Sequence, residues 1–217
     1  MKHQAFHAGI FAANTAPGAP PLVPEVILGL SEKVVPLWEQ TEAGGNTNPP
    51  PPYWAFAWPG GQALARYVLD HMEDFHGRTL LDFGAGSGLV AIAAAKAGAR
   101  AVATEIDPFA CAAIEANAKT NHVAVECLAE DVIGQDGGWD IVCFGDVHYE
   151  RPLAERIGPW ADSLAKRGAR ILLGDPGRSY FPKSHVRRLA TYDVPTSREL
   201  EDRDRRETSV YRLQATT

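Results

Sequence analysis

The feature that most constrains the fold is an apolar run that ends in a cluster of glycines, Leu81-Asp82-Phe83-Gly84-Ala85-Gly86-Ser87-Gly88. Residues 79–83 are typical of a short buried strand, and the Ala-rich residues 89–97, followed by Gly98, are typical of a helix. Glycines let the backbone turn tightly between these two elements and approach a ligand closely. The free N–H groups at the helix start form a slightly positive site, so the segment predicts a nucleotide-binding turn at the carboxyl end of a strand.

Strand-like and helix-like segments alternate on both sides of this turn. We expect further helices at residues 63–72, 107–120 and 152–166, and further strands at residues 99–105, 123–128, 141–147 and 169–173. This alternation predicts an α/β, doubly wound fold, in which helices cover both faces of a parallel sheet.

The C-terminal residues 176–217 have a different pattern. We expect a helix near residues 182–189 and two extended segments at residues 190–200 and 207–214, with a densely charged run at residues 197–208. The favoured interpretation is a solvated hairpin at a sheet edge, where charges discourage pairing with other chains. The alternative is that the charged run docks a substrate.

Composition and charge exclude several classes of protein. The chain has 217 residues, of which 45% are hydrophobic and 22% charged, as expected for one large domain or a domain with a tail. A net charge of −6 disfavours nucleic acid as a partner, and no apolar stretch reaches the length of a membrane span. Cys111, Cys127 and Cys143 are too widely spaced for a disulfide framework, and the histidines lack metal-ligand spacing. We therefore expect a cytoplasmic protein without a metal site.

The N-terminal region is rich in Pro, Gly and Ala. We expect residues 1–20 to form a flexible arm and residues 42–52, which include four consecutive prolines, to form a stiff spacer. Residues 1–62 are thus predicted to be an arm and linker that pack on the ligand site, and residues 63–217 to be the ligand-binding domain.

The spacing around the turn discriminates between nucleotides. The glycines follow the pattern Gly84-x-Gly86-x-Gly88, with Leu89 where a dinucleotide fingerprint has its last glycine, and the Gly-Lys-Ser/Thr of a P-loop is missing. Asp82 precedes the turn, where a carboxylate can meet an ammonium group. Glu105 ends the next expected strand, where it can accept hydrogen bonds from two ribose hydroxyls. A ligand with a ribose, an ammonium group and no phosphate fits both carboxylates, and S-adenosylmethionine is such a ligand.

These residues resemble the first motif and the ribose carboxylate of the class I, seven-strand S-adenosylmethionine-dependent methyltransferases. The resemblance implies a Rossmann-like sheet of seven mostly parallel strands with an antiparallel C-terminal hairpin and an N-terminal extension. In this class an acidic residue after the third strand often meets the adenine amino group. Of Glu130 and Asp131 we favour Asp131, with a loop-capping turn residue as the alternative. The turn residues that would contact the cofactor are Gly84, Gly86, Ser87 and Gly88.

Other segments narrow the resemblance. Residues 144–149, Phe-Gly-Asp-Val-His-Tyr, resemble the Asp/Glu-x-x-Tyr/Phe motif of the seven-strand protein-lysine methyltransferases. Residues 54–62 resemble the tryptophan segment that closes over the cofactor in that group. Together with Gly-Asp-Pro-Gly-Arg at 174–178 and Val-Pro-Thr-Ser-Arg-Glu-Leu at 194–200, the pattern resembles the electron transfer flavoprotein β-subunit lysine methyltransferase family, bacterial branch. The resemblance extends from about residue 23 to the C-terminus.

The motif after the fourth strand supplies the candidates for catalysis. Methyl transfer needs an aligned and neutral amine, because a protonated lysine has no lone pair. Asp146 is predicted to hold the target amine, and Tyr149 to form one wall of a lysine channel, its ring facing the methylated cation. A general base at His148 is the less favoured interpretation, because side-chain alternation in an extended segment would direct it elsewhere.

The tryptophan segment and the fifth strand supply the remaining candidates. Trp58 is predicted to contact the cofactor, and Gly60 to leave room for it. Tyr53 and Trp54 either line the substrate entrance or cover the core. The same kind of choice, between a substrate contact and a turn residue, applies to Asp175 and Arg178.

The resemblance implies a protein-lysine N-methyltransferase whose cofactor is S-adenosylmethionine. It implies the β subunit of electron transfer flavoprotein as the substrate, and ribosomal proteins as secondary targets. The acidic net charge is compatible with a lysine-rich target. The alternatives are a small-molecule methyltransferase with the same cofactor site, a non-catalytic module that kept the fold, and, more distantly, a nicotinamide dehydrogenase.

Overall fold

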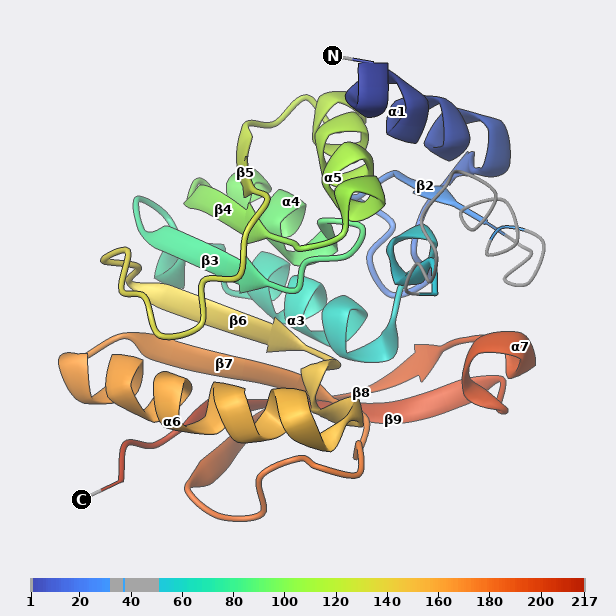
Figure 1. Ribbon diagram of the computed structural model, residues 1–217. Helices are drawn as coiled ribbons and strands as arrows, with labels where there is room; N and C mark the ends of the chain where they lie inside the picture. Colours follow the sequence, from blue (N-terminus) through green and yellow to red (C-terminus); the bar gives the residue numbers. More distant parts are fainter. Residues whose placement is uncertain (1, 32–36, 38–50, 217) are drawn as a thin grey trace.

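A central seven-stranded sheet with helices on both faces forms the body of the molecule (Figure 1). The computed structural model describes residues 2–31, 37 and 51–216. Helices α3 (Pro59–Asp70), α4 (Leu89–Lys96) and α5 (Pro108–Thr120) pack on one face, and α6 (Arg151–Arg167) packs on the other. The predicted doubly wound α/β fold is therefore confirmed. None of the helices in the described part of the chain is long and apolar enough to cross a membrane.

The strand order places the predicted turn near the middle of the sheet. The order is β5-β4-β3-β6-β7-β9-β8, in which the first five strands are parallel and the last two form an antiparallel hairpin. The sheet thus has the seven mostly parallel strands and the C-terminal hairpin that the resemblance implied. The strands are β3 (Thr79–Phe83), β4 (Arg100–Thr104), β5 (Val125–Leu128), β6 (Ile141–Gly145), β7 (Arg170–Asp175), β8 (Val186–Pro195) and β9 (Arg205–Leu213).

Local signals fix the helix ends close to the predicted positions. Asp107 caps α5, because its side chain accepts a hydrogen bond from the Phe109 N–H, and a proline occupies the first turn. Gly168 ends α6 in the left-handed conformation, with φ at 107°. The loops before α5 and α6 follow β4 and β6 in the chain and therefore lie at the carboxyl ends of these strands.

The helix predicted at residues 182–189 is wrong. That stretch leads into β8, whose first residue, Val186, pairs with Leu213 of β9. Val186 and Leu213 pack with Phe181 and Tyr211 beneath α6. Pairing with a strand further along the chain therefore overrides the local helical pattern. A single turn of helix, α7 (Arg198–Glu201), lies between β8 and β9, inside the predicted extended segment.

The N-terminal region also differs from the expectation of a flexible arm. Residues Lys2–Asn14 form α1, which lies across α5 (Figure 1), with Phe6 and His7 against the ring of Phe109. Strands β1 (Ala16–Gly18) and β2 (Leu28–Leu30) pair in a small antiparallel sheet. Aromatic side chains thus pack a helix onto α5 in a segment for which the composition predicted no regular structure. The predicted spacer, residues 42–52, lies outside the described residues apart from Pro51 and Pro52.

The start of α3 lies against the end of β7. A Cβ atom on Gly60 would come within 2.2 Å of the Gly174 carbonyl oxygen and 2.5 Å of Asp146 Oδ2. Glycine is therefore required at position 60. The close approach of α3 to β7 places the segment before α3 over the carboxyl ends of the strands. The boundary expected after residue 62 falls inside this helix.

Candidate active site

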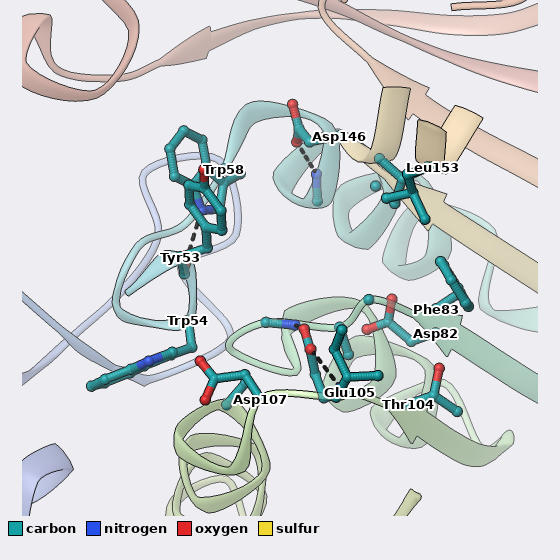
Figure 2. Close-up of a pocket in the computed structure, with 18 of the residues that line it drawn as sticks. Tyr53, Trp54, Trp58, Asp82, Phe83, Thr104, Glu105, Asp107, Asp146 and Leu153 are labelled. Carbon is teal, nitrogen blue, oxygen red and sulfur yellow. Dashed lines mark hydrogen bonds between the residues drawn. The ribbon is translucent and has the colours of Figure 1, made fainter. Parts of the chain in front are cut away.

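A cavity of about 440 Å³ opens at the carboxyl ends of β3, β4 and β6 (Figure 2). This is the edge at which a doubly wound sheet binds its ligand. The structure brings most of the predicted site residues together there. Those that line the cavity are Tyr53, Trp54, Trp58, Asp82, Gly84, Gly86, Ser87, Glu105, Asp131, Asp146, Tyr149 and Arg178.

The glycine-rich turn between β3 and α4 forms the floor of this cavity. Gly84 and Gly86 have positive φ angles, 62° and 53°, which side chains rarely adopt. Gly88 is also left-handed but does not line the cavity. It caps α4 and packs against Ile114, whose side chain would lie 3.2 Å from an added Cβ. Gly88 therefore shapes the turn, and its contact with the cofactor stays a prediction.

Glu105 is anchored by the backbone of two loops. Its Oε1 accepts a hydrogen bond from the Gly86 N–H at 2.8 Å, and its Oε2 accepts one from the Ile106 N–H at 3.1 Å. Burial raises the pKa of this carboxyl, and these amide bonds oppose the rise. The side chain is thus held between the glycine-rich turn and the end of β4, with its carboxylate at the cavity wall.

Asp82 is the most deeply buried carboxyl in the cavity wall. Its side chain is 3% exposed, and its Oδ2 accepts a hydrogen bond from the Ala91 N–H at 3.0 Å. Burial raises the pKa of Asp82 to about 7, and the nearby Glu105 carboxylate adds to that rise. A cationic group bound in the cavity would therefore stabilise the ionised form of Asp82.

Two further observations indicate a polar ligand in this cavity. The Thr104 hydroxyl is buried at the wall and has no hydrogen-bond partner among the described residues. Buried polar atoms in proteins are seldom left unpaired, so a bound group is expected to supply a partner. With the carboxylates of Asp82 and Glu105 on either side, the residues fit an adenosine with an attached ammonium group.

Asp131 lies at the side of the cavity nearest α6. It forms an ion pair with Arg156, and its Oδ1 accepts a hydrogen bond from the Ile133 N–H at 3.0 Å. The Arg156 guanidinium lowers the pKa of Asp131. Asp131 thus caps its loop and also lines the cavity, and its contact with the adenine amino group stays a prediction.

Asp146 follows β6 in the left-handed conformation, with φ at 57°. Its Oδ2 accepts the N–H groups of Gly60 at 2.5 Å and Gly61 at 3.2 Å. Its Oδ1 accepts two bonds from Arg178, from Nη2 at 2.6 Å and from Nε at 3.1 Å. Gly60 does not line the cavity and anchors Asp146, and its contact with the cofactor stays a prediction. The Asp146 carboxylate is fixed in direction by α3 and by the loop after β7.

Aromatic side chains form the mouth of the cavity. The rings of Tyr53 and Tyr149 lie 5.8 Å apart and are 40% and 46% exposed. The Trp58 Nε1–H donates to the Tyr53 carbonyl oxygen at 2.8 Å. Trp54 is buried and stacks on Phe109, and its ring points away from the cavity in Figure 2. Of the two interpretations of Trp54, the structure therefore favours the covering of the core.

Two further candidates from the sequence, in addition to Gly60 and Gly88, lie outside the cavity lining. Asp175 is buried, and its Oδ1 accepts the N–H groups of Gly177 at 2.7 Å and Arg178 at 2.6 Å. It is a turn carboxylate outside the cavity lining, and its contact with a substrate stays a prediction. His148 is buried against Phe181, with its Nδ1 3.6 Å from Asp175 Oδ2. It does not line the cavity, although Val147–Tyr149 form a 3-10 turn and not the extended segment that was expected.

Sequence reasoning missed two parts of the site. The Gly61 N–H bonds to Asp146, and Glu201, from the charged run expected to be solvated, is only 6% exposed. Glu201 forms ion pairs with Arg178 and Arg206. No local pattern distinguishes Glu201 from the charged residues around it, because its burial depends on a partner in the loop after β7.

Comparisons with known proteins agree with this geometry. The family model described as ribosomal protein L11 methyltransferase (PrmA) matches residues 62–144. The chain is 39% identical over 189 residues, 81% of its length and 70% of the relative's, to the electron transfer flavoprotein beta subunit lysine methyltransferase of Danio rerio. It is 36% identical over 197 residues to the protein of the same name from Xenopus laevis, with 87% of this chain and 79% of the relative covered.

A solved structure gives the same picture of the fold. Magnesium protoporphyrin IX methyltransferase from Synechocystis PCC 6803, crystallised with bound SAM, superposes with a TM-score of 0.54 at 19% identity. The match covers 71% of this chain and 80% of that one. At 19% identity this likeness shows the fold alone. The two sequence relatives, at 39% and 36% identity, cover most of the chain.

Proposed function

The chain belongs to the electron transfer flavoprotein β-subunit lysine methyltransferase family, and from this premise we propose that it methylates lysine side chains of a protein, with S-adenosylmethionine as the methyl donor. One observation carries the proposal. A cavity walled by the anchored carboxylates of Asp82 and Glu105 on one side continues to Asp146 and an exposed tyrosine pair on the other. The first side suits an adenosine with an ammonium group, and the second suits an approaching amine.

The cofactor supplies a methyl group on a sulfonium, which is a good electrophile. We assign the ribose hydroxyls to Glu105 and the ammonium group to Asp82, because each carboxylate has free acceptor capacity at the cavity wall. Asp131 is the candidate for the adenine amino group. The remaining candidates for contact are Trp58, Gly84, Gly86 and Ser87.

The residues at the mouth prepare the amine. A lysine that enters between Tyr53 and Tyr149 loses water, and this desolvation favours the neutral amine that the transfer needs. Asp146 borders the same space, and its contact with Arg178 Nε, at 3.1 Å, is the longer of the two on Oδ1. We propose that the target amine donates to Oδ1 at this side, where it replaces the longer bond from Arg178 Nε. The Tyr149 ring then faces the methylated cation.

The substrate assignment follows the relatives. Their names support the β subunit of electron transfer flavoprotein as the target, and the match to the ribosomal protein L11 methyltransferase family over residues 62–144 supports ribosomal protein as a second target. A net charge of −6 is compatible with lysine-rich proteins and disfavours nucleic acid. The free cysteines Cys111, Cys127 and Cys143 agree with a reducing compartment, which we propose to be the cytoplasm.

The test is a methylation assay with labelled S-adenosylmethionine. Purified electron transfer flavoprotein, purified ribosomal proteins and a bacterial lysate are incubated with the enzyme, and mass spectrometry locates any added methyl groups. Label in lysine residues of the flavoprotein β subunit is expected. Label that accumulates in a small metabolite and in no protein would instead establish the small-molecule alternative.

A matched variant separates binding from transfer. Asp146→Asn keeps the size of the side chain and is expected to bind S-adenosylhomocysteine within about threefold of the wild type, because the cofactor carboxylates are unchanged. Its rate of transfer is expected to fall by about 100-fold or more, since alignment of the amine is lost. An equal loss of cofactor binding and transfer would contradict the role given to Asp146.

A further inference from the structure

Four charged side chains from distant parts of the chain form a cluster beside the cavity. They are Asp146 and Arg178, which line the cavity, and Glu201 and Arg206. Arg178 bridges two carboxylates: it contacts Asp146 and also donates to Glu201, from Nη2 to Oε1 at 2.5 Å and from Nη1 to Oε2 at 3.2 Å. Arg206 donates to Glu201 at 3.0 Å. The four residues come from the loop after β6, the loop after β7, helix α7 and strand β9.

This cluster is withdrawn from solvent. The side chains of Glu201, Asp146 and Arg178 are 2%, 11% and 16% exposed. Charges buried to this degree lose hydration, and apolar residues of similar volume often stabilise a fold equally well. The arrangement therefore needs an explanation other than stability, and its position beside the target amine suggests one.

The protein itself fills the acceptor positions of Asp146. A carboxylate has about four lone-pair sites, and the N–H groups of Gly60 and Gly61 take two of them on Oδ2. The two bonds from Arg178 lie on Oδ1, which is the oxygen we assign to the target amine. The Arg178 guanidinium therefore orients Oδ1 and stabilises its negative charge.

The charges around Asp146 oppose one another. Burial raises the pKa of Asp146 to about 6, and the Arg178 guanidinium opposes this rise. The carboxylates of Asp175, on β7, and Glu201, on α7, raise the same pKa further. The other titratable groups close by are Arg206 beside Glu201, His148 beside Asp175, and Tyr149 at the mouth. Without the guanidinium, two carboxylates would face Asp146 with no cation in contact with it.

We propose that Arg178 is a positioning residue for methyl transfer: anchored on the buried Glu201, it directs the Asp146 carboxylate and keeps it ionised at the edge of the cavity. This inference rests on the proposed function, because it assigns Asp146 to the target amine. The C-terminal hairpin then takes part in the reaction through α7, although none of its residues lines the cavity.

The first measurement needs no protein substrate. The Asp146 carboxyl is titrated by carbon-13 NMR in the wild type, Arg178→Gln and Arg178→Lys, with Asp146→Asn to assign the signal. Removal of the guanidinium in Arg178→Gln should raise the midpoint by about one pH unit or more, as expected for the loss of an adjacent opposite charge. Arg178→Lys, which retains a cation, should titrate near the wild type. A midpoint that is unchanged in Arg178→Gln would overturn the proposal, whether or not the protein methylates lysine.

The second measurement is the pH profile of methyl transfer. Arg178→Gln should lower kcat by about 10- to 100-fold at neutral pH and move the acid limb to higher pH, with KM for S-adenosylmethionine within about threefold. Arg178→Lys should recover the position of the limb but only part of kcat. Glu201→Gln should lower kcat because it removes the anchor of Arg178. It should not move the acid limb of the profile to higher pH, because it also removes a negative charge near Asp146.

Arg205→Gln is the matched control. Arg205 lies next to Arg206 on β9, and its ion pair with Asp193 is exposed and remote from the cavity, so its kcat and pH profile should match the wild type. Equal losses in the Arg205 and Arg178 variants would indicate a general structural effect and overturn the proposal. If Arg178→Gln does not fold, Arg178→Lys and Glu201→Gln decide between these outcomes. Absence of protein methylation by the wild type would count against the proposed function, and the NMR titration would still decide the role of Arg178.

Discussion

The two sides of the cavity hold their carboxylates in different ways. On the β3–β4 side, backbone amides do so: Ala91 bonds to Asp82, and Gly86 bonds to Glu105, with at most 19 residues between partners. On the β6–β7 side, Asp146 depends on Gly60 and Arg178, which are 86 and 32 residues away. One side is built by the local chain, and the other by elements that meet only in the folded protein.

This difference separates two requirements of the reaction. The first side has only to present fixed acceptors to a ligand that is the same in every turnover, and backbone amides provide these without side-chain entropy. The second side must direct a carboxylate toward an amine brought by another protein. There the start of α3 and Arg178 both hold the carboxylate, and the C-terminal hairpin anchors Arg178 through Glu201. Changes to α3 or the hairpin should therefore affect the second side and spare the first.

The largest effect is expected from Gly60→Ala. The added Cβ would lie 2.2 Å from the Gly174 carbonyl oxygen, and a backbone atom inside the sheet cannot move away easily. We expect a loss of about 3 kcal/mol in the free energy of unfolding, the cost of overpacking at a rigid contact. Chemical denaturation of the purified variant measures it.

Gly61→Ala is the control for this substitution. An added Cβ on Gly61 meets nothing within 4 Å, so the change should alter the free energy of unfolding by less than about 1 kcal/mol. Similar losses in the two variants would mean that the contact between Gly60 and Gly174 does not hold the second side together.

Glu105→Gln tests the first side. The substitution replaces a charged acceptor by a neutral amide at the end of β4, where Glu105 is assigned to the ribose hydroxyls. Hydrogen bonds to a charged group contribute about 1.5–3 kcal/mol, so the affinity for S-adenosylhomocysteine should fall by roughly 10- to 100-fold. Isothermal titration calorimetry measures it, and thermal unfolding should change little.

Glu130→Gln is the matched control. Glu130 is exposed at the edge of the same cavity, and the same substitution there should leave the affinity within about twofold. A loss as large as that of Glu105→Gln would point to the overall negative charge of the cavity, rather than to one anchored acceptor.

The contrast also explains what the sequence could predict. The turn from β3 to α4 and the start of α5 depend on residues within a few positions of each other, and both were predicted close to the observed places. The helix expected at residues 182–189 was wrong, because Val186 pairs with Leu213, 27 positions along the chain. The charged run around Glu201 was expected to be solvated for a similar reason. The partner that buries Glu201 is Arg178, and no local pattern indicates that contact.

A smaller effect is expected from pH on ligand binding through Asp82. Burial raises the pKa of this carboxyl to about 7, so the fraction that is ionised rises steeply between pH 6 and pH 8. A ligand ammonium prefers the ionised form, and the affinity for S-adenosylhomocysteine should therefore increase by about tenfold over this range.

Two comparisons isolate that dependence. Asp82→Asn cannot ionise and should bind with little change between pH 6 and pH 8. Adenosine, which has the ribose but no ammonium group, should also show a weaker dependence in the wild type. A steep dependence that persists in Asp82→Asn would assign the titration to another group, with Glu105 first, because burial raises the pKa of that carboxyl as well.

The smallest effect is expected from Asp131→Asn, which compares a solvent-exposed carboxylate with the buried ones on the same side. The side chain of Asp131 is 42% exposed and is already paired with Arg156. A bond from the adenine amino group to this acceptor would contribute about 0.5–1.5 kcal/mol, so calorimetry should show an affinity lower by roughly three- to tenfold. Arg156→Gln frees the Asp131 carboxylate and should weaken binding less than Asp131→Asn does. If neither variant changes the affinity, Asp131 only caps its loop, and the adenine is held by other parts of the wall.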